Sequence, residues 1–358
     1  MMPVDNVYCI SFNGKQDTFA MGSDSGIRVI KVVPLQEVKS FSVDEVGSVT
    51  IVRILNKTNL LGIVSGGKFP KFAGNAALIF DAFNRKFVVE ITVNSLVTNF
   101  AFSYSKLIVA QAKHVTVFSF PNNLQKLRCE ELAEHCNGLF AFNADPKAEY
   151  LVYPGRTVGS VHIVNLLTTN QTFCPAPLII NAHKNKIARL AINNLGTMIA
   201  TGSTQGTLIH IYNAKNGEKL FELRRGMDTV NLRCLRFSPC SNYLLASSNK
   251  GTIHIFSVTT KRNESHKSLA DLLNKDERRS ISRITLKKGE EDSECVFINN
   301  FMPNSSHKSN ILNICNDDII SVSTKPCLTH FSGSNGELKD YVDLSELGDN
   351  HDFWTTPI

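Results

Sequence analysis

Gly206-Thr-Leu-Ile-His-Ile-Tyr212 and Gly251-Thr-Ile-His-Ile-Phe256 are two versions of one short stretch. Each begins with a glycine and ends in an isoleucine followed by a bulky aromatic residue. Short, β-branched runs after a glycine are typical of β-strands that leave a turn. Each also follows a run of small residues, at Ala200-Thr-Gly-Ser203 and at Ala246-Ser-Ser248. The two stretches therefore predict the same β unit at two places in the chain.

The aliphatic-then-bulky pair recurs along the whole chain. It appears at Val29-Ile30, Ile79-Phe80, Val117-Phe118, Ile163-Val164, Ile211-Tyr212 and Ile255-Phe256. Successive pairs are 38 to 50 residues apart, near the roughly 40 to 45 residues of a four-stranded propeller blade. Six blades are thus marked. Another copy at Thr329-His330-Phe331 predicts a seventh blade, preceded by extra residues.

The rest of the chain agrees with an all-β fold. Convincing helical patterns are absent, and strand-like runs are separated by Asn, Gly, Pro and Lys. No blade ends in the Trp-Asp pair of WD40 repeats, so we expect a divergent, WD40-like β-propeller. We place the propeller at residues 1–342, with a long polar loop at 259–280 within blade six and an acidic tail at 343–358.

Composition excludes several classes of protein. Of the 358 residues, 42% are hydrophobic and 20% are charged, which is ordinary for a folded domain. No signal peptide and no apolar run of 18 residues is present, so we expect a cytoplasmic protein. The nine cysteines include no pair separated by two residues, so we expect reduced thiols and no metal. The net charge of +6 suits an anionic partner, either nucleic acid or acidic lipid.

Enzyme motifs are missing. The sequence has no Gly-x-Ser-x-Gly and no His-Glu-x-x-His. Gly66-Gly67-Lys68 is the nearest match to a nucleotide loop, but the spaced partner glycine of such a loop is missing and no helix follows. We therefore expect no catalytic residue and no cofactor.

Two adjacent arginines in Leu223-Arg224-Arg225-Gly226 are the strongest candidates for a binding site. Consecutive side chains on a strand point to opposite faces, so Arg224 and Arg225 should serve two different pockets. Gly226 would let the backbone turn away without a Cβ penalty. Arginine matches phosphate well, although an exposed edge strand with a basic tip is the plainer alternative.

Polar residues gather on both sides of the arginine pair in the sequence. Hydroxyl and basic groups together make an inventory for binding phosphate. They are His183, Lys184, Ser203, Thr207 and His210 before the pair, and Ser247, Ser248, Lys250, Thr252 and His254 after it. Since equivalent strand ends line up around a propeller rim, blade five would present the first group with Arg224 and blade six the second with Arg225.

This combination of motifs resembles the PROPPIN (WIPI) family of phosphoinositide-binding β-propellers. The resemblance also covers Gly66-Gly-Lys-Phe-Pro-Lys-Phe72, Ser119-Phe-Pro121 and Tyr153-Pro-Gly155. Many members have phenylalanine at the position of Leu223. The leucine, together with the Pro70-Lys71-Phe72 loop, is similar to the subgroup whose members work with the autophagy lipid-transfer protein.

The resemblance implies seven blades and two sites for phosphatidylinositol 3-phosphate or 3,5-bisphosphate. By position, the first site is His183, Lys184, Ser203, Thr207, His210 and Arg224, and the second is Arg225, Ser247, Ser248, Thr252 and His254. His210 stands where the family usually has arginine, so we expect the first site to bind phosphate more weakly or in a pH-dependent way.

The resemblance further implies a monomeric peripheral membrane protein of forming autophagosomes, and of endosomes, that positions the lipid-transfer partner. We expect Leu269, Leu272 and Leu273 of the blade-six loop to touch the bilayer, and the loop at Pro70-Lys71-Phe72 to support partner docking. The alternative is a protein-interaction scaffold with no specific lipid binding. We expect no nucleic-acid binding, because few aromatic residues lie near the basic ones.

Overall fold

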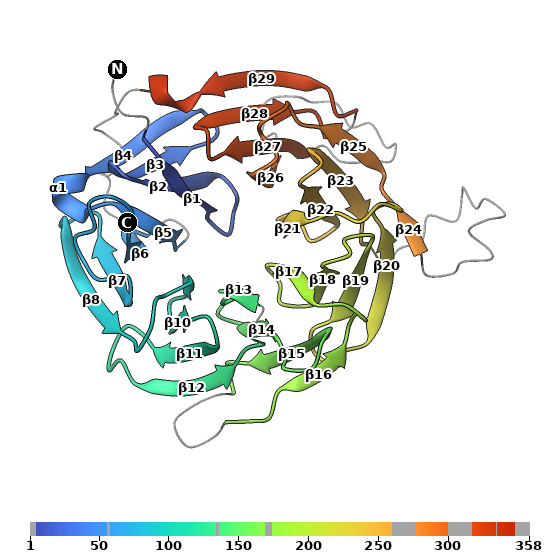
Figure 1. The fold of residues 1–358 in the computed structure, drawn as a ribbon, viewed down its shortest axis with the longest axis horizontal. Coiled ribbons are helices and arrows are strands. Elements are labelled where there is room, and N and C mark those ends of the chain that lie inside the picture. Colours follow the sequence, from blue (N-terminus) through green and yellow to red (C-terminus); the bar gives the residue numbers. More distant parts are fainter. Residues whose placement is uncertain are drawn as a thin grey trace.

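Seven β-sheets of four or five strands follow one another around a ring (Figure 1). The computed structural model describes residues 5–55, 58–133, 136–168, 174–259, 277–299, 317–333 and 335–347. Within each sheet the strands are neighbours in the sequence and antiparallel, apart from one added strand described below. The arrangement is a seven-bladed β-propeller, which confirms the predicted fold.

Each blade takes four strands, numbered in chain order. Blades one to three contain β1 (Val7–Phe12), β2 (Thr18–Ser23), β3 (Gly26–Lys31) and β4 (Gln36–Ser42); β5 (Val49–Ile54), β6 (Leu60–Ser65), β7 (Ala76–Asp81) and β8 (Lys86–Thr92); and β9 (Asn99–Phe102), β10 (Lys106–Ala110), β11 (His114–Ser119) and β12 (Lys126–Glu131). Blades four and five contain β13 (Ala141–Asn143), β14 (Tyr150–Pro154), β15 (Ser160–Asn165) and β16 (Leu178–Asn181); and β17 (Ile187–Ile192), β18 (Met198–Ser203), β19 (Leu208–Asn213) and β20 (Lys219–Arg224). Blades six and seven contain β21 (Leu232–Phe237), β22 (Tyr243–Ser248), β23 (Thr252–Ser257) and β25 (Ser282–Thr285); and β26 (Ser293–Asn299), β27 (Asp317–Ser323), β28 (Cys327–Phe331) and β29 (Leu338–Asp343).

The third strand of each of the first six blades carries the repeated apolar pair, on β3, β7, β11, β15, β19 and β23. The seventh copy, Thr329-His330-Phe331, lies on β28, the third strand of blade seven. Each face of a blade packs against a neighbouring blade, and consecutive residues point to opposite faces. Ile211 is buried against blade six, for example, and Tyr212 is buried against blade four. Both residues of the pair are therefore apolar.

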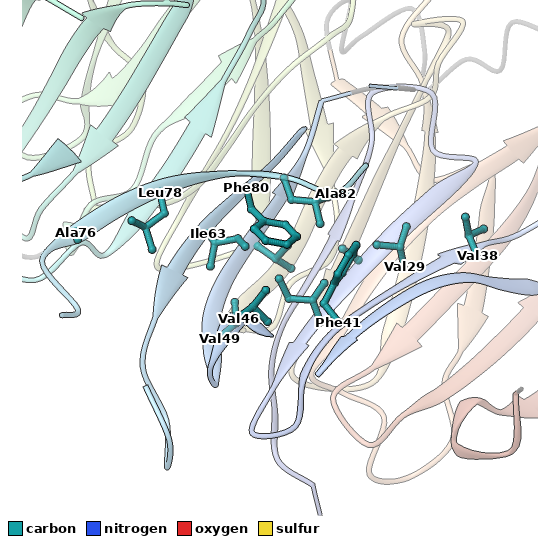
Figure 2. Close-up of a cluster of buried hydrophobic side chains, with 14 residues drawn as sticks. Val29, Val38, Phe41, Val46, Val49, Ile63, Ala76, Leu78, Phe80 and Ala82 are labelled. Carbon is teal, nitrogen blue, oxygen red and sulfur yellow. The ribbon is translucent and has the colours of Figure 1, made fainter. Parts of the chain in front are cut away.

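The core of the molecule lies between the blades. Seven apolar clusters fill the seven seams between neighbouring blades. Figure 2 shows the seam between blades one and two, where Val29 and Phe41 of one blade meet Ile63 and Phe80 of the next. The rings of Phe41 and Phe80 meet edge to face with their centroids 5.1 Å apart.

The ring closes without an exchanged strand between blades one and seven, because β1 to β4 and β26 to β29 each form a complete sheet. An apolar cluster joins the two blades. Gln16 adds a polar clasp, since its side-chain amide donates to the carbonyl of Phe237 at 2.9 Å and accepts from the N–H of Phe297 at 2.9 Å. Gln16 is only 4% exposed, so the side chain joins blade one to blades six and seven from inside.

The extra residues before the seventh blade occupy two places instead of one. Residues 260–276 lie between β23 and β25 of blade six, and residues 300–316 lie between β26 and β27 of blade seven. The predicted loop at 259–280 also contains a short strand, β24 (Glu277–Arg279), which adds to the edge of blade five parallel to β20. The excess length was thus wrongly assigned to blade six alone.

The predicted tail begins inside the propeller. Its first residues finish β29 and form the helical turn η2 (Leu344–Glu346), and Leu344 is fully buried in the seam with blade one. Another helical turn, α1 (Val43–Val46), links blades one and two. Among the described residues, no helix is both long and apolar enough to cross a membrane, and the cysteines are free thiols.

Candidate functional site

The strand β20 lies between two seams and presents one arginine to each. Leu223 is fully buried in the cluster shared with blade six, so Arg224 points to the other face, toward blade four. Arg224 is in register with Leu208 on that face. Arg225 follows the end of the strand and points back toward blade six. There its charge adds to the effect of burial in lowering the pKa of His254. The two arginines therefore face different seams of the propeller.

The first group of candidate residues lies at the seam between blades four and five and includes two stacked histidines. The rings of His183 and His210 are 4.3 Å apart and 4° from parallel. Nε2 of His183 lies 2.9 Å from the hydroxyl of Thr201, and Nδ1 of His210 donates to the carbonyl of Ala182 at 2.7 Å. The pair thus joins the end of blade four to the middle of blade five.

Burial lowers the pKa of both histidines and so disfavours their charged forms. Burial lowers the pKa of His183 to about 4, with the neighbouring His210 adding to the effect. Burial also lowers the pKa of His210. Nε2 of His210 lies 3.2 Å from a carboxylate oxygen of Glu222. This geometry does not support a phosphate contact by His210, because the ring already faces a carbonyl and a carboxylate.

A glycine of blade four shapes the loop that carries His183 and Lys184. The carbonyl of Gly159 accepts the N–H of Ala182 at 2.9 Å and of His183 at 3.1 Å. Gly159 has a φ of +76°, and an added Cβ would lie 1.7 Å from the carbonyl oxygen of His183. Sequence reasoning missed Gly159, although its place right after the Tyr153-Pro154-Gly155 landmark was a usable signal. Lys184 on this loop is exposed.

The other residues of the first group come from the turn between β18 and β19. Ser203 and Thr207 are both buried. The carbonyl of Ser203 accepts the N–H of Gly206, and that of Thr207 accepts the N–H of Arg225 at 2.9 Å. The turn between the second and third strands and the segment after the fourth therefore meet on one rim of the propeller.

Arg225 is a buried residue. It is 9% exposed, and its Nε donates to the carbonyl of Gly206 at 3.1 Å. Nη2 donates to the carbonyl of Asp228. The carboxylate of Asp228 is engaged by Lys250 at 2.9 Å. The guanidinium is thus held by neutral groups, and its charge remains available to an anion.

The second group of candidate residues faces Arg225 from blade six. The hydroxyls of Ser248 and Thr252 lie 3.5 Å apart, and His254 follows two residues later on the same face. Burial lowers the pKa of His254 to about 4, and the charges of Arg225 and Arg283 add to the effect. A neutral imidazole still offers a donor to a phosphate oxygen.

Ser247 is not brought into this group. Paired residues of neighbouring strands share a face, and Ser247 pairs with Ile253, which points toward blade seven. The hydroxyl of Ser247 accepts the N–H of Cys234 at 3.1 Å. The residue therefore satisfies a backbone group on the far side of the sheet.

Gly226 does not have the expected conformational role. Its φ is outside the left-handed region, and nothing lies within 4 Å of an added Cβ. The next residue, Met227, is 89% exposed. The backbone therefore turns here without requiring glycine.

Two other predicted regions have different outcomes. Leu269, Leu272 and Leu273 lie outside the described residues. In the loop before β7, the ammonium of Lys71 donates to the carbonyl of Glu45 at 2.7 Å, and Phe72 packs against Phe87. These two side chains hold the loop to α1 and the core. Phe69 remains 65% exposed.

The Phe69 loop lies on the same rim as the two arginines, since it joins the second and third strands of its blade. Figure 1 places blade two across the ring from blades five and six. The loop expected to support partner docking is thus separated from the two arginines by the width of the ring, and lies on the same rim.

The family model described as PROPPIN matches residues 6–275. The chain belongs to the PROPPIN family. This PROPPIN is 29% identical over 352 residues to Ectopic P granules protein 6 of Caenorhabditis elegans, covering 95% of this chain and 88% of the relative. It is 31% identical over 255 residues to SVP1-like protein 2 of Schizosaccharomyces pombe, covering 71% and 68%.

Solved structures with the same fold include other propellers of this kind. Kluyveromyces lactis Hsv2 matches this PROPPIN with a TM-score of 0.76 and 21% identity, over 95% of this chain and 99% of that chain. A chain from a complex of KlAtg21 with the coiled-coil of AgAtg16 matches with a TM-score of 0.70 and 15% identity, over 94% and 99%. At these identities the likeness concerns the fold.

Proposed function

We propose that this PROPPIN binds phosphatidylinositol 3-phosphate or 3,5-bisphosphate through its two candidate sites and is recruited from the cytosol to forming autophagosomes. Membership of the family supports an autophagy-related, phosphoinositide-binding propeller. The observation that carries the two-site proposal is the position of Arg224 and Arg225 on opposite sides of β20, each at a different seam. Two weak sites on one rigid body bind a membrane well, because the second headgroup is captured at high effective concentration.

The first site would comprise His183, Lys184, Ser203, Thr207 and Arg224, with His210 as a positioning residue that orients His183. The second would comprise Arg225, Ser248, Thr252 and His254. The hydroxyls and neutral imidazoles would donate hydrogen bonds, and the guanidinium groups would supply the charge that a phosphate needs.

Liposome flotation tests this proposal. Wild-type protein should float with vesicles that contain either 3-phosphorylated lipid, and less with equally charged phosphatidylinositol 4-phosphate or phosphatidylserine. The double variant Arg224→Thr, Arg225→Thr should lose this binding. Lys215→Thr is the matched control, because Lys215 is exposed in the turn between β19 and β20, on the other rim. Equal flotation with all anionic lipids would favour the scaffold alternative.

The residues of the long blade-six segment belong to the same proposal. We propose that Leu269, Leu272 and Leu273 contact the bilayer next to the headgroup sites. Changing all three to Asp should weaken vesicle binding about tenfold or more, because charged groups resist entry into the lipid interface, and should leave binding of a soluble inositol headgroup unchanged. Unchanged vesicle binding would contradict the contact.

A protein partner would dock across the ring, near the exposed Phe69 on blade two. The partner that the family suggests is a lipid-transfer protein of autophagy. The related propeller KlAtg21 was solved with a coiled coil of AgAtg16, so a protein partner suits this fold. The double arginine variant should still capture the partner, and Phe69→Ser should lose it while keeping lipid binding. Loss of both activities in either variant would contradict separate surfaces.

A further inference from the structure

The chain returns from residues 260–276 through two strands, and each brings an arginine toward one of the proposed sites. The first, β24, lies beside β20 at the outer edge of blade five (Figure 1). The strands are parallel and pair Arg224 with Arg279. Because paired residues in neighbouring strands share a face, Arg279 stands on the same face as Arg224, toward the first site.

The second returning strand is β25, the outer strand of blade six. It pairs Arg283 with His254, so both side chains face the seam with blade five. Three side chains from the two neighbouring blades therefore converge at this seam: Arg225 from blade five, and His254 and Arg283 from blade six. Arg283 is close enough to contribute to lowering the pKa of both His254 and Arg225, in each case after the larger effect of burial.

Arg279 and Arg283 differ from most other arginines of this region in having no partner among the residues that the structure describes. Both are exposed. By contrast, Arg236 pairs with Glu294 at 2.8 Å, and Arg225 donates to two carbonyls. A guanidinium with its donors unused is well suited to bidentate binding of phosphate.

Arg278 fixes the returning chain in place. Its Nη1 donates to the carbonyls of Ser257 and Thr259, each at 3.0 Å, and its guanidinium lies 3.8 Å from the ring centroid of Phe221. These contacts tie β24 to the third strand of blade six and to the last strand of blade five. The position of Arg279 beside Arg224 is therefore built into the fold.

We propose that Arg279 extends the first site and Arg283 extends the second as further ligands for the phosphates of a 3-phosphorylated inositol headgroup. This inference rests on the proposed function of the two sites. Each site then presents two guanidinium groups, Arg224 with Arg279 and Arg225 with Arg283. Two such groups match a headgroup with two phosphate monoesters better than a headgroup with one, so the pair favours the 3,5-bisphosphate.

The test compares Arg279→Ser and Arg283→Ser with wild type. Short-chain, soluble forms of phosphatidylinositol 3-phosphate and 3,5-bisphosphate are titrated into each protein, and flotation is measured with vesicles of each lipid. Each variant should bind the soluble bisphosphate about three- to tenfold more weakly at its own site, with a smaller loss for the monophosphate. Both changes together should remove the preference for the bisphosphate.

Two controls separate this inference from its alternatives. Lys215→Ser removes the same charge from the other rim and should bind as wild type, so an equal loss in that variant would reduce the effect to net charge and overturn the inference. Melting temperatures should be unchanged in Arg279→Ser and Arg283→Ser, since both side chains are exposed. A matching loss of stability would assign them a structural role instead.

The outcomes also separate the inference from the proposed function. If Arg224→Thr, Arg225→Thr abolishes binding while Arg279→Ser and Arg283→Ser bind as wild type, the two-site proposal stands and the added ligands are wrong. If the double variant still binds 3-phosphorylated lipid as wild type does, the proposed function itself fails.

Discussion

The guanidinium of Arg225 has both a binding role and a structural role, so a substitution should change lipid binding and stability together. It faces the second site, and it also satisfies the carbonyls of Gly206 and Asp228. Arg225→Thr removes both donors, so the free energy of unfolding should fall by about 1 to 3 kcal/mol. Urea denaturation measures this loss, and Lys215→Thr should stay within about 0.5 kcal/mol of wild type. Unchanged stability of Arg225→Thr would mean that water replaces the guanidinium at no cost.

His183 and His254 make a second residue-scale prediction, which concerns pH. Burial lowers the pKa of each to about 4, below the roughly 6.5 of an unfolded histidine. The unfolded chain therefore binds more protons between these values, so stability is full above about pH 6.5 and falls as the pH drops toward 4. Melting temperatures across this window should decline more steeply for wild type than for His183→Gln, His254→Gln. Equal slopes would contradict the neutral state of the two rings.

The sequence could place the residues of the candidate sites only as far as local rules reach. Alternation along a strand could predict that Arg224 and Arg225 point to opposite faces. Hydrogen bonds between distant residues were out of reach, as with His210, whose partner Ala182 is 28 positions away. Ser247 was misplaced although alternation also applies to it: Ser247 and Ser248 must face opposite seams. The run Ala246-Ser-Ser248 does not show which of the two faces blade five.

At the scale of single elements, two glycines offer a matched pair of tests. Gly159 has a left-handed backbone, and an added Cβ would collide with the carbonyl of His183. Gly159→Ala should therefore cost about 1 to 3 kcal/mol and weaken the first site by moving the His183 loop. Gly226→Ala should be close to neutral in stability, since its added Cβ meets open space. Denaturant unfolding and headgroup titration measure both effects, and similar costs in the two variants would refute the argument from backbone geometry.

The short strand β24 shows where element prediction from sequence ends. Its three residues Glu277–Arg279 are too few to show a period, and they lie in a run of charged side chains that is typical of a loop. The strand exists because β20 presents an unpaired edge to it and Arg278 holds it there. Only the tertiary neighbour identifies it as a strand.

At the scale of the whole ring, Gln16 should contribute more to the free energy of unfolding than a surface glutamine does. Gln16→Asn keeps an amide that tolerates the positive φ of 60° but is too short to reach both Phe237 and Phe297. At least one buried backbone group would lose its partner, which should lower the free energy of unfolding by about 1 to 3 kcal/mol. Gln125→Asn, in a turn of blade three, is the control and should be near neutral. Equal effects would show that the clasp does not stabilise the closed ring.

The blade number could be predicted because every third strand meets the same requirement for apolar residues on both faces. The way the ring closes could not be predicted, because it depends on contacts between the first and last blades, which are far apart in the sequence. The extra residues of blades six and seven also shared one measured gap between apolar pairs, so the sequence could not divide them.

The absence of an exchanged strand has a consequence during synthesis of the protein. Blades can fold in order as the nascent chain leaves the ribosome, since each uses only consecutive strands. The face of blade one that contains Phe12, Phe19 and Ile30 nevertheless waits uncovered until blade seven and Leu344 have been translated. A premature stop codon that removes blade seven would leave this apolar face exposed to chaperones and proteases, although every residue of both candidate sites would already have been made.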